Sequence, residues 1–222
     1  MRKITSERIL QAAIVDIKKN GIVNFSLPGL ADKAHVSKST IYDCFPTKDD
    51  IMLAVFRADL LRRLDSMLEI EHCPDLNVVD KIICCYSFVL YLHRHTGNNH
   101  GLMFLATNPT MWRRANPNLI SDVDHLLQRI FRFPERLIER IAVENNETLK
   151  PSSRTKLLMN LQAIERGYLV NTLNYALQPI YVSAPLEQYI EVLIRELRTT
   201  LRSPLPQYSI DRVTDYLEKN AL

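Results

Sequence analysis

The chain has 222 residues, of which 46% are hydrophobic, so it can bury a substantial core as one large domain or two smaller ones. Its net charge is only +3, from 28 basic and 25 acidic residues, and this balance by itself favours no class of partner. There are only 5 glycines. Apolar and charged residues recur at spacings of three and four, without a sustained alternation of apolar and polar positions. The composition therefore predicts an all-α protein.

The N-terminus and the cysteines indicate the compartment. No apolar stretch follows residues 1–7, so we expect no secretory signal. The longest apolar segment, 82–92, is shorter than the roughly 20 residues that cross a bilayer. The four cysteines form no CxxC pair and no zinc-ligand spacing; they are Cys44, Cys73, Cys84 and Cys85. We expect free thiols, no metal or cofactor, and a reducing cytoplasm.

Four helices are expected in the first 72 residues, over about 5–20, 26–35, 38–45 and 47–72. Gly21 follows the first helix as a stop signal. Ser26 and Ser37 are suited to cap the second and third helices. Thr47 and Asp50 have the spacing of a capping box at the start of the fourth.

Beyond residue 74, proline-bearing turns separate further predicted helices at about 76–95, 100–107, 117–145, 151–177, 186–202 and 209–219. Pro134 should kink or split the third of these. We expect a three-helix N-terminal domain in residues 1–50 and a larger helical domain in residues 51–222.

The two short helices at 26–35 and 38–45 are too short to be stable alone and must pack on their neighbours. A compact unit of this kind presents its last helix to the major groove of DNA. That helix starts with small polar side chains and one cation, which allow close approach to bases and phosphates. The candidate DNA-binding residues are Ser26, Ser37, Lys38, Ser39, Thr40, Tyr42 and Lys48. The alternative is that Tyr42 belongs to the core and that the two lysines are merely solvated.

In this segment the sequence resembles the tetracycline-repressor (TetR) family. The main match is Val36-Ser37-Lys38-Ser39-Thr40-Ile41-Tyr42, followed by Phe45 and Lys48, within a resemblance that covers residues 5–55. The resemblance implies a homodimer on a palindromic operator, usually a repressor that a small molecule releases. It also implies that helices 151–177 and 186–202 form the dimer interface and that the middle helices enclose the effector.

Several positions depart from the family pattern: His35, Gly29, Asp43 and Cys44. His35 stands where the turn usually has glycine, so it must adopt a left-handed conformation. Asp43 brings a negative charge close to the phosphates, where it either reads a cytosine amino group or weakens binding. A protein-interaction module with a degenerate helix-turn-helix is therefore the alternative to a DNA-binding regulator.

Candidates for an effector pocket and a dimer interface lie in the C-terminal part. Side chains that could line a pocket are Phe88, Tyr91, Met103, Trp112, His125, Tyr168 and Asn171. Apolar stripes that could pair two copies include Leu161, Tyr189, Leu193 and Leu197. Both sets would serve equally well as ordinary core.

Metal and enzyme functions find little support. His93, His95 and His100 are spaced unlike metal ligands and are better read as a solvated helix end. The chain has no GxSxG, no phosphate-binding glycine loop and no HExxH, so we do not expect an enzyme.

Overall fold

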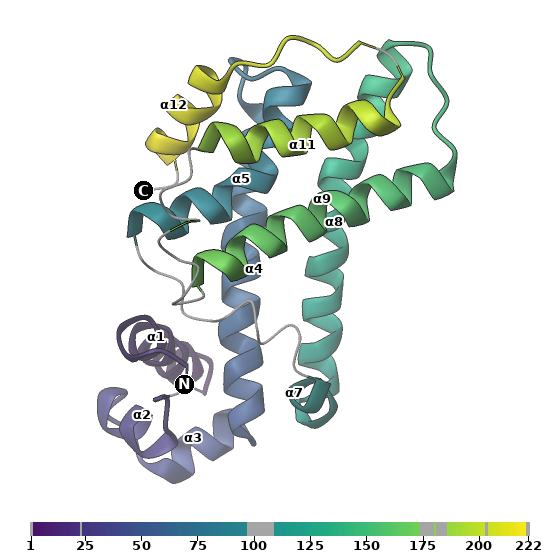
Figure 1. Ribbon diagram of the computed structural model, residues 1–222. Helices are drawn as coiled ribbons and strands as arrows, with labels where there is room; N and C mark the ends of the chain where they lie inside the picture. The colour runs from purple at the N-terminus through teal and green to yellow at the C-terminus, as the bar shows by residue number, and fades with distance from the viewer. Residues whose placement is uncertain are drawn as a thin grey trace. The chain divides into compact units, whose positions relative to one another are not determined.

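The computed structural model describes residues 2–22, 24–96, 109–173, 180, 186–202 and 204–220, and every regular element in these ranges is helical (Figure 1). The all-α prediction is confirmed. The helices are α1 (Arg2–Asn20), α2 (Leu27–Lys33), α3 (Lys38–Cys44), α4 (Lys48–His72), α5 (Val78–Thr96), α7 (Pro109–Arg114), α8 (Pro117–Glu144), α9 (Pro151–Leu173), α11 (Leu186–Thr200) and α12 (Ile210–Asn220).

The observed helices differ from the predicted ones in two respects. The short helix α7 was not expected; it begins with a proline, which suits a first helical position. Helix α8 continues through Pro134 and is not split. Phe133 and Leu137 are both buried, so packing on either side of the proline offsets its missing hydrogen bond. The predicted helix at 100–107 and residues 174–177 of another lie outside the described residues.

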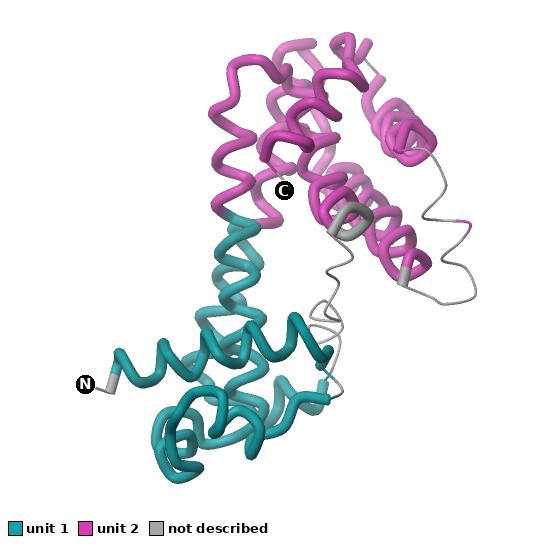
Figure 2. The backbone as a smooth tube through the Cα atoms, turned by 90° about the vertical axis from the view of Figure 1, so that its left-hand side faces the viewer, with its two compact units in different colours: residues 1–64, 98–129 teal, residues 65–97, 130–222 magenta. Residues whose placement is uncertain are grey.

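The chain forms two compact units, drawn in teal and magenta in Figure 2. Unit 1 comprises residues 1–64 and 98–129, and unit 2 comprises residues 65–97 and 130–222. Helices α4 and α8 each have residues in both units.

In unit 1, the helices α1, α2 and α3 pack on one another in pairs. Their shared core contains Ile9, Ile17, Leu30 and Ile41, each at most 1% exposed. A part-buried ion pair joins two of these helices, because the exposed Lys33 of α2 donates to the buried Asp16 carboxylate of α1. These contacts stabilise helices that are individually too short to persist.

In unit 2, α9 packs on α5 and α11, and α12 packs on α5. Tyr189 is fully buried; its hydroxyl donates to the Tyr86 carbonyl at 2.6 Å and its ring lies edge-on to Tyr168, with centroids 4.8 Å apart. Asp80 of α5 accepts hydrogen bonds from Ser209 and Arg212 at the start of α12. Among the described helices, none has the length and apolar character needed to cross a membrane.

Candidate DNA-binding site

The α2–α3 pair begins at a capped turn. Ser26 has extended backbone angles, and its hydroxyl accepts a hydrogen bond from the Gly29 amide at 3.3 Å, which confirms the predicted N-cap. A Cβ atom at Gly29 would lie 3.1 Å from the Ser26 hydroxyl. Glycine at this position therefore leaves room for the cap, which accounts for a residue that otherwise weakens a helix.

The turn between α2 and α3 depends on His35, whose φ of 50° is the predicted left-handed conformation. The amides of His35 and Val36 donate to the carbonyls of Asp32 and Ala31, at 3.2 and 3.1 Å. These bonds satisfy carbonyls that the end of α2 leaves free. The tight turn fixes the direction in which α3 leaves α2.

Helix α3 has one buried and one exposed face. Ile41 is 1% exposed and anchors the helix in the core, whereas Tyr42 is 50% exposed. Lys38, Ser39 and Asp43 are exposed as well. The open face of α3 therefore carries a cation, a hydroxyl, a phenol and a carboxylate, all groups that can bond base edges or phosphates.

The first turn of α3 is a cluster of hydroxyl groups. Ser37 caps the helix by accepting from the Thr40 amide at 3.1 Å, as predicted. The Ser37 oxygen also lies 2.7 Å from that of Ser39 and 2.8 Å from that of Thr40. Three of the five predicted DNA-binding hydroxyl groups are thus brought together and orient one another. Ser26 lies apart from them, at the start of α2.

Lys48 makes a contact within the protein that the sequence did not reveal. Its ammonium donates to the Phe25 carbonyl at 2.7 Å and stands 5.4 Å from the centre of the Phe25 ring. Lys48 is the first residue of α4, and Phe25 immediately precedes the Ser26 cap of α2. The residue predicted to touch DNA therefore bridges the two ends of the helix-turn-helix.

Residues 9–55, which include α2, α3 and most of α1, match the family described as bacterial regulatory proteins, tetR family. The chain therefore carries a TetR-family helix-turn-helix domain over residues 9–55. It is accordingly a transcriptional regulator that carries a DNA-binding helix-turn-helix.

Solved TetR-family structures share the fold at low sequence identity. A TetR transcription regulator from Haloarcula marismortui has a TM-score of 0.65 and 15% identity, over 89% of this chain and 98% of that one. A TetR transcriptional regulator from Legionella pneumophila has a TM-score of 0.58 and 18% identity, over 88% of this chain and 96% of that one. The transcriptional regulator FadR from Bacillus subtilis, in complex with stearoyl-CoA, has a TM-score of 0.55 and 19% identity, over 86% of this chain and 98% of that one. No curated protein matches the chain in sequence.

The structure distributes the predicted effector-pocket residues over both units. Phe88 and Tyr91 lie on α5, and Tyr168 and Asn171 lie on α9, all within unit 2 and at least half-buried. Burial, followed by the nearby charge of Glu218, raises the pKa of Tyr91.

Two of the remaining pocket candidates belong to unit 1. Trp112 on α7 is half-buried and His125 on α8 is exposed. Met103, like His100, lies outside the described residues. The described residues include no group of three metal-binding side chains.

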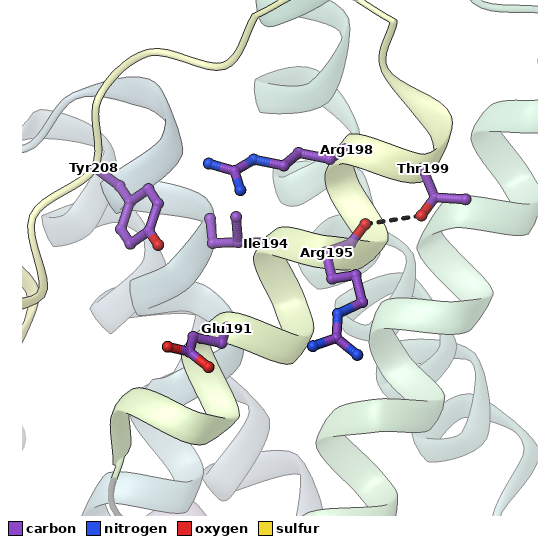
Figure 3. A pocket seen from close by; sticks show the side chains of 6 residues that line it. All are labelled: Glu191, Ile194, Arg195, Arg198, Thr199 and Tyr208. Carbon is purple, nitrogen blue, oxygen red and sulfur yellow. Dashed lines mark hydrogen bonds between the residues drawn. The ribbon is translucent and has the colours of Figure 1, made fainter.

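A surface pocket of about 390 Å³ lies instead on α11 and the segment that follows it (Figure 3). Ile194 forms its buried floor, and Arg198, Glu191 and Tyr208 surround it. Arg195 and Thr199 complete the lining. None of the predicted effector residues contributes to this polar pocket.

The four predicted interface residues lie in the core of unit 2. Leu161, Tyr189, Leu193 and Leu197 are each 0% exposed within the single chain. They pack between helices of the same copy, since α9 and α11 contact one another. A partner would have to use the opposite faces of these helices, because side chains already enclosed in one copy cannot contact another.

Sequence reasoning also missed Asp16 as a residue that holds the DNA-binding helices together. A signal was present, because Asp16 shares the apolar face of α1 with Ile9, Ala13 and Ile17. A charge on such a face needs a partner when buried. The partner, Lys33, is 17 residues away and only folding brings it near.

Proposed function

We propose that this regulator is a repressor which binds a palindromic operator as a homodimer and is released by a small-molecule effector. Residues 1–50 bind DNA, and residues 51–222 bind the effector and dimerise. The protein acts in the cytoplasm on double-stranded DNA and catalyses no reaction.

The observation that carries this proposal is the exposed face of α3. The helix is anchored by Ile41 and capped by Ser37, so its exposed side chains are held in a defined orientation. Lys38 and Ser39 lie at its N-terminal end, the part of a recognition helix that contacts base edges. Tyr42 is placed one turn later and its half-exposed ring brings a hydroxyl within reach of a phosphate.

The effector part of the proposal rests on unit 2 and on the related proteins. FadR from Bacillus subtilis was solved with stearoyl-CoA, so a regulator of similar fold holds a small molecule. In this chain, Phe88, Tyr91, Tyr168 and Asn171 combine aromatic surface with polar groups on two helices that pack together. An effector bound there would alter the positions of α5 and α9. We propose that α4 shifts in response and so changes the spacing between the α3 helices of the two copies in the dimer.

For the dimer we propose the outward face of α9. Met159 is 64% and Val170 is 40% exposed, which leaves two large apolar side chains uncovered. Between them lie the exposed Ala163 and Gly167, on the same side of the helix. Small residues flanked by apolar ones allow the same helix of a second copy to approach closely, as an interface with two-fold symmetry requires.

The test is selection of bound fragments from a random pool of duplex DNA at about 150 mM salt, where non-specific binding is weak. We expect enrichment of a palindrome whose half-sites are about 34–36 Å apart or a multiple of that distance. The enriched duplex should then lose binding to a Lys38→Met variant. Failure to enrich any sequence would contradict the proposal and favour a protein-interaction role for the helix-turn-helix.

A further inference from the structure

We propose that Lys48 is a positioning residue, which sets the placement of α2 and α3 for DNA binding through the Phe25 carbonyl and does not itself contact phosphate. This inference rests on the proposed DNA contact by α3. It differs from the simplest interpretation of a lysine at this place, which is a cation directed at the DNA backbone.

The argument starts with the geometry of the ammonium group. Its hydrogen bond to the Phe25 carbonyl is 2.7 Å long, the short distance typical of a charge-assisted bond. The same ammonium stands 5.4 Å from the centre of the Phe25 ring, within range of a cation–π contact. Two favourable contacts to one residue hold the side chain toward the protein, in competition with any phosphate.

The acceptor is well fixed. Phe25 is 2% exposed, so its ring cannot move without disturbing the core of unit 1. Its carbonyl belongs to the residue just before the Ser26 cap. A bond to that carbonyl therefore holds the start of α2.

The bond between Lys48 and Phe25 connects two segments that are distant in the sequence. It joins residues 23 apart, one just before α2 and the other at the start of α4, and so closes the helix-turn-helix into a loop. A neighbouring contact also holds the first turn of α4, because Asp50 caps this helix and accepts a hydrogen bond from the Asn116 amide at 2.6 Å. The first turn of α4 is thus bonded both to the start of α2 and to the start of α8.

Three variants test the proposal. Lys48→Met keeps an unbranched side chain against the Phe25 ring but removes the donor and the charge. Lys48→Arg restores both. Lys38→Met removes a lysine from the exposed face of α3 and is the comparison for a direct DNA contact. Affinity for the selected duplex is measured over a range of salt concentrations, at a temperature where all variants are folded by circular dichroism.

We expect Lys48→Met to weaken binding about tenfold or more, the value of a bond to a charged donor. The slope of log affinity against log salt should stay at the parent value, and Lys48→Arg should recover most of the affinity. In Lys38→Met the slope should fall by about 0.9 if that lysine neutralises a phosphate. A similar fall in slope for Lys48→Met would overturn the proposal, as would unchanged affinity.

Hydrogen exchange supplies a readout without DNA. Lys48→Met should accelerate exchange of the Gly29 and Leu30 amides, which bond to Ser26 in the first turn of α2. Unchanged exchange there would contradict a positioning role. If the parent protein bound no DNA, the proposed function would fail, yet the exchange result would still decide whether Lys48 holds α2.

Discussion

Asp16 shows how one charged residue can determine local structure. Its side chain is 3% exposed and accepts hydrogen bonds from Lys33 and from Asn20. Burial alone raises the pKa of Asp16, but the bonds from Lys33 and Asn20 and the Lys33 charge outweigh it, so the pKa lies below its ordinary value. The folded state therefore favours the ionised carboxylate.

A pH dependence of stability follows. Because the pKa of Asp16 is lowered on folding, its contribution is complete above the unfolded value of about 3.9 and is lost as the pH falls through the folded value. We expect Asp16→Asn to lower the free energy of unfolding by about 1–3 kcal/mol at neutral pH. The deficit should shrink below about pH 4. Denaturant unfolding at several pH values measures this, and a deficit independent of pH would contradict it.

The cysteines should differ in reactivity. Cys84 and Cys85 are at most 3% exposed, whereas Cys44 and Cys73 are half-buried. Burial, followed by the charge of Asp80 and by Cys73, raises the pKa of the Cys84 thiol far above its usual range. Since the thiolate is the reactive form, a thiol reagent at neutral pH should label Cys44 and Cys73 first. Mass spectrometry of the native protein checks the order, and early labelling of Cys84 would contradict it.

At the scale of elements, Asp80 joins α12 to α5. Its carboxylate is 0% exposed, caps α5 by accepting from the Asn77 amide, and also accepts from the Ser209 amide at 2.9 Å. Arg212 of α12 adds two guanidinium nitrogens, at 2.9 and 2.8 Å. The Asp80 side chain thus caps α5 and also bonds to the start of α12, 129 to 132 residues later in the chain.

Removal of this carboxylate should be costly. We expect Asp80→Ala to destabilise unit 2 by about 3–5 kcal/mol, because it leaves buried donors without an acceptor. Arg212→Met should cost less, since that side chain is 43% exposed. Combining the two in a double-mutant cycle should give a coupling above about 0.5 kcal/mol. Additive effects would show that the ion pair contributes little.

At the scale of the whole molecule, dimerisation through α9 makes a specific prediction. A side chain added at Gly167 meets nothing within 4 Å in the monomer, so Gly167→Glu should fold normally. It would, however, place a charge where the second copy must approach. We expect the parent protein to sediment at twice the 25.7 kDa of one chain at micromolar concentration, and Gly167→Glu to sediment as a monomer.

Val143→Glu is the matched control, because Val143 is 74% exposed and lies on a different helix, α8. It should remain dimeric. A dimeric Gly167→Glu protein, or a monomeric parent, would refute the α9 interface. The variant should also lose affinity for the palindrome, since each copy would then bind one half-site alone.

The sequence by itself determined the features that depend on neighbouring residues. The caps at Ser26 and Ser37, the Thr47–Asp50 box and the left-handed turn at His35 all involve residues three to five apart, so local stereochemistry is sufficient. The match at residues 9–55 is likewise a local pattern. For these reasons the helix order and the helix-turn-helix could be predicted.

Only the tertiary structure decided the roles of residues that act across the chain. Lys48 bonds to Phe25, Asp16 to Lys33 and Asp80 to Arg212, at separations that no local pattern encodes. The same holds for Leu161 and Tyr189, because an apolar stripe looks identical whether it packs on its own chain or on a second copy. Burial is a property of the assembled fold, and a sequence states which side chains are apolar without stating what covers them.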